Sequence, residues 1–531
     1  LRHSRESEAP DVPGSIRSLV QASIDQLSPA DKTAIQAASV IGQRVDPDLV
    51  CHLIDDTGFD FDSLVERNML RFESQSYLFA HALIRDVVYG SLLTPTRIAL
   101  HRRAAVWFEE SELGLSAEHL ALVGSPEAHS AFLAAARHEI GRYHFDSALA
   151  LIERGLQLAE DPTDRVALCL LAGDTWLDIG RVEDAEVQYS HALHNAGTPE
   201  DRSHALIGIA GVRRIVEETD SALEVLEQAS EFAVEAGLLA EQSRIHFLRG
   251  NLLFPRGDFE ACHQEHEEGL RLARQAGRQD LETASLGGLG DAEYVRGRMV
   301  SARARLEECV RLASEQDLGR IEVANHAQLA HTLLYTSTQE EALEVAGSAI
   351  EHAARIGHAR AEINARAAVI KALFVLARYE ACLEEIDRYE IIIEQLGVAR
   401  FRQIAFTFGG GAMHALGRSS EAIAWLERGL EFARATGHGL HGPSIASALA
   451  VIVDDPERKR GLIELALSQC AAGCVGHNQF RVYADGIDVA FDLPDKAMLV
   501  DFIEAAESYP SGERVPWNVF HAARGRALLE D

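Results

Sequence analysis

Residues 286–313 read LGGLGDAEYVRGRMVSARARLEECVRLA, and this stretch decides the fold. Its small residues include Gly290, Ala302, Cys309 and Ala313. Small residues let two antiparallel helices approach closely, while larger apolar residues at helical spacing fill the grooves around them. Gly297 lies between the two halves, where glycine supplies the left-handed conformation that ends a helix. The stretch therefore predicts a helical hairpin.

The same frame recurs along the chain. The small residue that opens the second helix returns at spacings of 37, 37 and then five times 40 residues: Ala148, Ala185, Ala222, Cys262, Ala302, Ala342, Cys382 and Ala422. Small residues also fill most positions twelve before, seven after and eleven after these. Repetition at this period is typical of stacked helical arrays. The sequence predicts an all-α fold, with a right-handed α-α superhelix of about eight hairpins over residues 111–437.

Beyond residue 437 the frame decays. Residues 438–531 still show helical patterns, but the columns of small residues are lost. We expect degenerate helical repeats there, ending in a half-repeat at WNVFHAARGRALLED, residues 517–531. An unpaired half-repeat is an unstable end, so we expect the natural protein to continue further.

The first 110 residues follow a different pattern. After a linker at residues 1–12, residues 13–110 predict three short helices, a hairpin formed by MLRFE (69–73) and SYLFA (76–80), and further helix. Three helices and a two-stranded wing describe a winged-helix domain. Residues 1–110 hold 11 basic and 16 acidic residues. A module that reads DNA needs the opposite sign, so the fold is expected and a nucleic-acid role is not.

Composition and charge exclude several classes of protein. The chain has 531 residues, with 82 acidic and 50 basic side chains and a net charge of −32. Such a surface repels phosphate backbones and anionic lipids, so we expect neither nucleic acid nor membrane as a partner. No run of about 18 apolar residues is present. Seven scattered cysteines argue against a disulfide framework and favour a reducing, cytoplasmic location.

The columns of small residues resemble the tetratricopeptide repeat, whose eighth, twentieth and twenty-seventh positions are small. Units of 40 residues are similar to the elongated repeats in the arms of bacterial signalling ATPases. The resemblance implies a concave face lined by the first helix of each hairpin. In that register the face receives Asp174, Asn251, Asp291, His331 and Lys371, and three positions further on Phe254, Tyr294, Leu334 and Phe374. The aromatic residues fit the groove and the core between paired helices equally well.

Three stretches of the first 110 residues carry a second resemblance: LVQASIDQLSPADKTAIQAASVIG (19–42), FAHALIRDVVYGSLL (79–93) and LHRRAAVWFEE (100–110). They resemble the segment behind the nucleotide-binding domain of bacterial STAND-class ATPases, including those fused to class III nucleotide cyclases or LuxR-type regulators. The resemblance implies a winged helix folded over the nucleotide. The stretch FAHALIRDVVY also resembles the MHD motif of plant immune receptors, which implies that His81 senses the β-phosphate of bound ADP. Arg85 is among the matching residues, while Ala82 replaces the usual aspartate. The alternative for His81 is a neutral histidine packed in the core.

No catalytic constellation is found in the sequence. None of the four lysines stands in a phosphate-binding GxxxxGK[ST] loop, and the glycine clusters at 287–290 and 409–411 fall inside predicted repeat helices. Two groups have metal-like spacing, but Cys262 of the first fills a small-residue column, and the second lacks a fourth ligand: Cys262, His263 and His266, and Cys470, Cys474 and His477. We expect no enzyme activity, metal or cofactor in this chain, and ATP or ADP in the missing domain.

Two functions remain. The first is the sensor arm of a STAND-type signal-transduction ATPase, which binds a protein, peptide or small effector in the superhelix and relays it through the winged helix to its own nucleotide-binding domain. Oligomerisation on activation would fit this role. The second is a stand-alone scaffold or adaptor for protein–protein interaction, with the winged helix as a cap.

Overall fold

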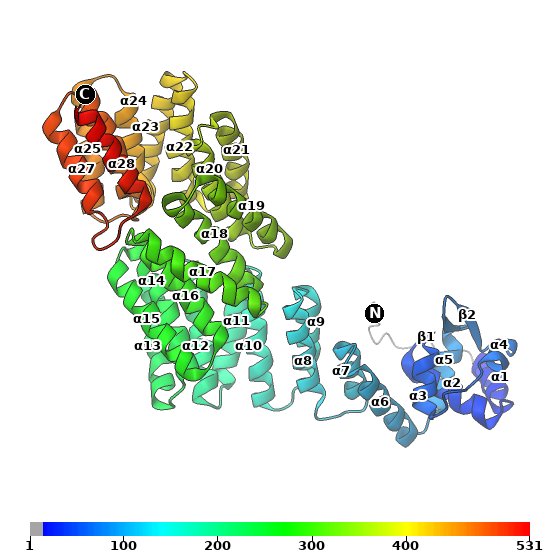
Figure 1. Ribbon diagram of the computed structural model, residues 1–531. Coiled ribbons are helices and arrows are strands. Elements are labelled where there is room, and N and C mark those ends of the chain that lie inside the picture. Colours follow the sequence, from blue (N-terminus) through cyan, green and yellow to red (C-terminus); the bar gives the residue numbers. More distant parts are fainter. Residues whose placement is uncertain (1–13, 531) are drawn as a thin grey trace. The chain divides into compact units, whose positions relative to one another are not determined.

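A computed structural model describes residues 14–530, so the expected linker at residues 1–12 lies outside the described residues. Contacts within the chain divide it into two units, residues 1–208 and residues 209–531. Each unit is described here by itself. Both are built almost wholly from α-helices, as Figure 1 shows, in agreement with the predicted all-α class.

The first unit begins with helices and one small sheet. Its elements are α1 (Gly14–Asp25), α2 (Pro29–Ile41), β1 (Arg44–Val45), α3 (Pro47–Ile54), α4 (Asp62–Glu66), β2 (Leu70–Glu73), β3 (Ser76–Phe79), α5 (Ala82–Ser91), α6 (Thr94–Phe108) and α7 (Leu113–Leu122). Ser28 caps α2 and Asp46 caps α3 by accepting a backbone N–H, which explains why both helices begin where they do. Ile35, Leu49 and Phe79 meet in one buried core.

The predicted hairpin is confirmed, but the sheet has a third strand that the sequence analysis missed. β2 and β3 pair antiparallel, and β1 pairs with the other edge of β3 to give the order β1-β3-β2. β1 is only two residues long, with Arg44 opposite Leu78 and Val45 opposite Tyr77. A strand of two residues shows no alternation, so no periodicity could have identified it.

The rest of the first unit is a series of helices: α8 (Ala128–Gly141), α9 (Phe145–Leu158), α10 (Pro162–Asp178), α11 (Val182–Asn195) and the start of α12 (Pro199–Ile215). α8 packs on α9 and α10 packs on α11, as expected for hairpins. Ala148 and Ala185, from the column of small residues, are fully buried at these contacts.

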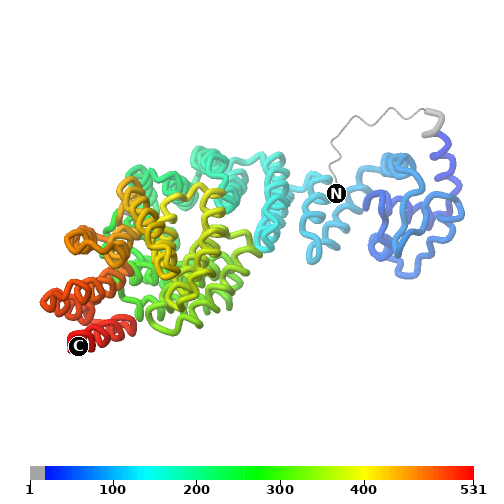
Figure 2. Tube along the Cα trace, turned by 90° about the horizontal axis from the view of Figure 1, so that it is seen from above, coloured from blue at the N-terminus to red at the C-terminus, as the bar shows by residue number. Residues whose placement is uncertain are grey.

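The second unit continues the hairpins, and Figure 2 follows their succession along the chain. Its elements are the end of α12, α13 (Thr219–Glu235), α14 (Leu239–Leu253), η1 (Phe254–Arg256), α15 (Phe259–Ala276), α16 (Gln279–Val295), α17 (Met299–Glu315), α18 (Gly319–Thr336), α19 (Gln339–Ile356), α20 (Ala359–Val375), α21 (Tyr379–Leu396), η2 (Ala399–Phe401), α22 (Arg402–Ala415), α23 (Ser419–Thr436), α24 (Gly442–Ile452), α25 (Pro456–Ala471), α26 (His477–Asp492), α27 (Lys496–Ser508) and α28 (Pro516–Glu530).

Small residues bring paired helices together as the sequence predicts. A Cβ atom added to Gly290 of α16 would lie 2.6 Å from the Leu306 side chain of α17, and one added to Gly410 would lie 2.5 Å from Leu426. The glycine clusters also lie inside helices, in contact with side chains, because a Cβ atom on Gly288 would meet the His266 ring at 2.4 Å. The prediction that these clusters serve helix packing is confirmed.

Residues 438–531 are more regular than the sequence suggested. α24 and α25 form a hairpin, α26 and α27 form another, and α28 packs against both α26 and α27. The first helices of successive hairpins contact one another from α14 through α28, so they form a continuous inner layer of the second unit. α28 also contacts α18, far back in the chain, so the C-terminal helices lie on this inner layer.

Candidate functional site

His81 lies on the surface of the N-terminal domain. It is the N-cap of α5, directly after β3, and its Nδ1 accepts a hydrogen bond of 3.2 Å from the backbone N–H of Leu83. Its side chain is exposed, so the alternative of a neutral histidine packed in the core is wrong. Whether His81 contacts a nucleotide stays a prediction.

Arg85 is held within the same domain. Its Nε donates to the backbone oxygen of Ser39 at 3.1 Å, its Nη1 donates to Asp86 at 3.1 Å, and its guanidinium lies 5.1 Å from the centre of the Tyr89 ring. These contacts attach α5 to α2. Arg85 therefore positions the helix that carries His81, and its role toward a nucleotide stays a prediction.

Three of the predicted groove residues, Asp174, Asn251 and Phe254, do not line the cavity described below. Asp174 belongs to the first unit, where its carboxylate accepts from the Tyr189 hydroxyl at 2.7 Å and pairs with His204 at 3.3 Å. Phe254 lies in η1 and packs edge-on against Phe259, with ring centres 6.2 Å apart. Asn251, on α14, is half-buried. Asp174 thus ties neighbouring helices together, and Phe254 packs within its own hairpin.

Tyr294, His331 and Lys371 lie on α16, α18 and α20, where the inner layer meets the C-terminal helices. They are 5%, 6% and 4% exposed, so the expectation that they line an open groove is wrong at these three positions. The cover is built by residues nearly 200 positions further on: Tyr294 hydrogen-bonds to His477 at 3.2 Å, and the N–H of Gly476 donates to the oxygen of Val295 at 2.8 Å. No local pattern of residues predicts this cover.

Phe374, on α20, packs in the core between helices, which is one of the two places that the sequence analysis left open for the aromatic residues. Its ring is 5.5 Å from that of Phe408 and 5.8 Å from that of Tyr379, and a Cβ atom on Gly411 would lie 2.6 Å from it. The Arg481 guanidinium of α26 lies 5.2 Å from the same ring. Phe374 therefore packs between helices and supports Arg481.

Lys371 is a buried cation without a carboxylate partner among the described residues. Its Nζ lies 3.4 Å from Nδ1 of His331, whose Nε2 donates to the backbone oxygen of Asn364 at 2.9 Å. Burial lowers the pKa of Lys371 to about 7. Burial and the Lys371 charge also hold the pKa of His331 well below its usual range. The pair therefore shares a single positive charge at most near neutral pH.

Two more buried histidines lie beside this pair. His477 is fixed, since its Nε2 donates to the oxygen of Leu440 at 2.9 Å and its Nδ1 accepts from Tyr294. The ring centre of His441 lies 4.3 Å from that of His477, with the rings tilted by 36°. Both ring nitrogens of His441 are buried without a hydrogen-bond partner in the described part of the chain. Burial is the main reason why both have pKa values well below normal, followed by the charges of His477 on His441 and of Lys371 on His477.

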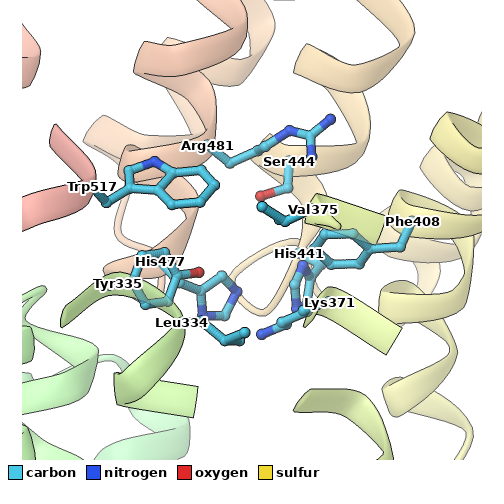
Figure 3. A pocket seen from close by; sticks show the side chains of 10 residues that line it. All are labelled: Leu334, Tyr335, Lys371, Val375, Phe408, His441, Ser444, His477, Arg481 and Trp517. Carbon is cyan, nitrogen blue, oxygen red and sulfur yellow. The ribbon is translucent and has the colours of Figure 1, made fainter. Parts of the chain in front are cut away.

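Lys371, His441 and His477 line one cavity of about 30 Å³, shown in Figure 3. Lys371, His441 and His477 gather at one side of it, and Arg481 and Trp517 lie across from them. The other lining residues are Leu334, Tyr335, Val375, Phe408 and Ser444. Six helices of the second unit contribute to the wall: α18, α20, α22, α24, α26 and α28, His441 being the N-cap of α24. The arrangement is a small chamber with Lys371 and two histidines at one side, Arg481 at the other, and mostly apolar walls.

A second polar group lies on the inner layer, where the sequence analysis named Asp291 but missed the arginines around it. Asp291 of α16 has its pKa raised to about 7 by burial, against the opposing effect of Arg360. The pKa of Arg214 is lowered to about 10, mainly by burial and secondly by the charge of Arg360. The pKa of Arg360 is also lowered, mainly by burial and secondly by the charge of Arg400. Arg360 of α20 thus interacts with Asp291, with Arg214 of α12 and with Arg400 of η2. The recurrence of arginine at 320, 360 and 400, at the repeat period, was a signal that could have revealed part of this group.

Other kinds of site find little support in the described part of the chain. Residues 14–530 contain no group of three or more His, Cys, Asp or Glu side chains placed to hold a metal ion. Cys262 is buried in its small-residue column, and His266 is 1% exposed between two helices. None of the helices described has the length and apolar character needed to cross a membrane.

Comparisons with known proteins give distant likenesses. No protein-family model matches the chain. An uncharacterised protein of Rhizobium meliloti (strain 1021) is 30% identical over 190 residues, which is 32% of this chain and 18% of that protein. The chain therefore spans less than a fifth of the length of this curated relative.

Two solved structures share the helical arrangement loosely. A signal-transduction ATPase with numerous domains and a tetratricopeptide repeat sensor, from Pyrococcus horikoshii, is 13% identical with a TM-score of 0.48, covering 86% of this chain and 65% of its own. A Rap protein in complex with competence and sporulation factor is 14% identical with a TM-score of 0.49, covering 69% of this chain and 98% of its own. Likenesses this weak say nothing of what the present chain binds.

Proposed function

We propose that this chain is the effector-binding, regulatory arm of a bacterial, cytoplasmic STAND-class signal-transduction ATPase. Residues 13–110 act as a winged-helix domain that contacts a nucleotide-binding domain outside this sequence, where ATP or ADP is held. The helical repeats bind a protein, peptide or small effector. The proposal rests on two supports: the resemblance of residues 19–110 to bacterial STAND-class ATPases, and the geometry of the second unit.

The observation that carries the proposal is the polar content of the inner layer in the second unit. Asp291, His331 and Lys371 stand on three successive inner helices, and of these three Lys371 lines the cavity. Burying an ionisable group away from a countercharge costs several kcal/mol, so packing alone does not favour it. A surface that keeps such groups is suited to recognising a ligand.

The N-terminal domain offers a place for the relay. His81 is exposed at a helix N-terminus, where backbone N–H groups and the helix dipole favour a phosphate. Arg85 holds this helix on α2, so a shift of α5 would move His81 relative to a bound nucleotide. Effector binding then acts by population shift, because the effector stabilises the arrangement in which the winged helix no longer clamps ADP.

His81→Ala in the full-length protein tests the relay. If His81 restrains the ADP-bound state, the variant loses ADP faster and shows a higher basal output, measured as the release rate of bound ADP. Asp46→Ala is the matched control, because it removes another N-cap of the same domain away from α5. Unchanged ADP release in His81→Ala, or equal effects of both variants, would refute the role of His81.

The alternative, a stand-alone scaffold, shares the repeat surface and gives the N-terminal domain no nucleotide to contact. The coding sequence upstream of Leu1 separates the two. A phosphate-binding loop with the GxxxxGK[ST] pattern there supports the ATPase arm, and its absence supports the scaffold.

A further inference from the structure

The cavity in the second unit is built as a receptor for one negative charge. Lys371 is 4% exposed and its only polar partner among the described residues is the neutral imidazole of His331. The other full cation at the cavity, Arg481, is already neutralised, since its Nε donates to Asp485 at 2.7 Å. One cation is therefore left without a countercharge in a wall of low polarity.

Donors without acceptors point into the same place. His441 is 1% exposed, lines the cavity and has both ring nitrogens unpaired. Its backbone N–H donates to Gln403 at 3.0 Å, which fixes the backbone at the start of α24. Buried polar groups without partners are rare in folded proteins and call for an occupant such as water or an ion.

The size and walls of the cavity decide the class of occupant. A volume of 30 Å³ is room for about two water-sized groups. The two oxygens of a carboxylate fit that room and carry a single charge, which balances Lys371. A phosphate at neutral pH carries more charge and four oxygens, and the wall offers mostly apolar groups from Tyr335, Phe408 and Trp517.

The cavity also has a way out. Val375 lines it and is 41% exposed, and Trp517 beside it is half-buried, whereas Lys371 and His441 are at the closed end. A ligand whose charged end binds at Lys371 and His441 can therefore place an apolar tail along Val375 and Trp517.

We propose that this cavity binds the carboxylate group of an organic acid, held between Lys371 Nζ and a ring N–H of His441, with its carbon chain against the aromatic wall. The inference goes beyond the proposed function, because it assigns a ligand class to this site whether or not an ATPase domain is attached. The carboxylate belongs either to a small free acid or to the C-terminus of a peptide.

Titration calorimetry on the whole chain tests the proposal at pH 6.5 and constant ionic strength. The probes are butyrate and benzoate, with butyramide and benzamide as uncharged probes of the same shape, and inorganic phosphate. We expect saturable binding of the acids and none of the amides or of phosphate. Equal binding of acid and amide, binding of phosphate in place of the acids, or no binding of any carboxylate probe would overturn the proposal.

A second set of titrations, with a peptide as the probe, identifies the source of the carboxylate. The tripeptide Ala-Ala-Phe is compared with its C-terminal amide. Binding of the free peptide but not of the amide, tighter than binding of butyrate, assigns the site to a peptide C-terminus. Binding of the short acids alone assigns it to a free organic acid. Both results support a carboxylate site, whereas equal binding of peptide and amide contradicts it.

Variants connect the binding to the residues. Lys371→Met keeps the length of the side chain and removes the charge, so butyrate should bind roughly tenfold more weakly or not at all. Lys459→Met is the matched control, because Lys459 is also buried but pairs with Asp492 at 2.8 Å outside the cavity. Unchanged affinity in Lys371→Met refutes the site. If that variant does not fold by circular dichroism, His441→Phe replaces it, with about fivefold weaker binding expected and unchanged binding as the refuting result.

Discussion

At the scale of single residues, two of the four lysines are buried, and their surroundings differ. Lys459 donates to Asp492 and to the backbone oxygen of Val451, so its charge is compensated. Lys371 has only an imidazole nitrogen as partner. The sequence placed Lys371 on the inner face of its helix, but it could not show that C-terminal helices would bury it there.

The burial of Lys371 predicts a pH dependence of stability. Its pKa is about 7 in the folded chain and about 10.5 in the unfolded chain, so between these values the unfolded chain binds a proton that the folded chain does not. The free energy of unfolding therefore rises with pH over this window and is lowest, for this group, below pH 7. The facing groups are His331, His441 and His477, whose pKa values are lowered, and Tyr335, whose pKa is raised by burial.

Lys371→Met should remove this contribution. Urea unfolding of both proteins at pH 7 and pH 9 gives the comparison. The free energy of unfolding of wild type, relative to that of Lys371→Met, should be larger at pH 9 than at pH 7, because only wild type carries a lysine that is neutral more readily in the folded chain than in the unfolded chain. The same difference between the two proteins at both pH values would contradict the buried, proton-poor state of Lys371.

His101 makes a similar prediction for the first unit. It is 1% exposed on α6, bonds to the Tyr89 hydroxyl at 2.9 Å and to His119 at 2.8 Å, and burial followed by the charge of His119 lowers its pKa to about 4. Because the fold binds this proton less well than the unfolded chain, stability contributed by His101 falls as pH drops from about 6.5 to 4. Histidine-labelled NMR, assigned with His101→Gln, should show a neutral ring at pH 5.5. A midpoint at 6.5 or above would contradict the burial.

At the scale of elements, the ends of the helices follow from backbone conformation. Gly277 and Gly357 cap α15 and α19 in the left-handed conformation, with φ values of 66° and 70°. Ala377 stands at the turn after α20 with φ 55°, a conformation that costs a side-chain-bearing residue free energy. Gly277 and Gly357 end second helices two repeat periods apart, whereas Ala377 lies between the two helices of its hairpin, where other units carry Gly257, Gly297 and Gly417.

Ala377→Gly should therefore stabilise the protein by about 1 kcal/mol, since glycine adopts this conformation without a steric cost. Gly357→Ala is the converse control and should destabilise it by about 1 kcal/mol at a position where an added Cβ meets no atom within 4 Å. Urea unfolding of both variants gives the comparison. A loss of stability in Ala377→Gly would show that its turn is not strained.

At the scale of the second unit, the contacts that cover the inner layer connect residues far apart in the chain. Tyr335 of α18 packs on Phe480 of α26 with ring centres 5.0 Å apart. Glu513 accepts from the N–H groups of Val300 and Ser301, at 2.9 and 3.1 Å, at the first turn of α17. A carboxylate at that place also interacts favourably with the helix dipole.

Glu513→Gln should loosen this cover. We expect faster hydrogen exchange in α28 and around Val300, and a stability loss of about 1–2 kcal/mol, because a charge-assisted contact with a helix N-terminus is lost. Glu507→Gln is the control, since Glu507 pairs with Arg526 at the surface and such pairs contribute little. Equal exchange in Glu513→Gln and wild type would show that Glu513 does not hold the C-terminal helices.

The sequence by itself determined the helical hairpins, their period and the two-stranded hairpin near residue 73, because each depends on residues close together in the chain. It also placed His331, Lys371 and Tyr294 on the inner faces of their helices. Only the tertiary structure decided that these faces are covered, that His441 and His477 join Lys371, and that β1 completes the sheet. Contacts between residues about 180 positions apart depend on the accumulated curvature of many hairpins, and no local pattern of side chains encodes that sum.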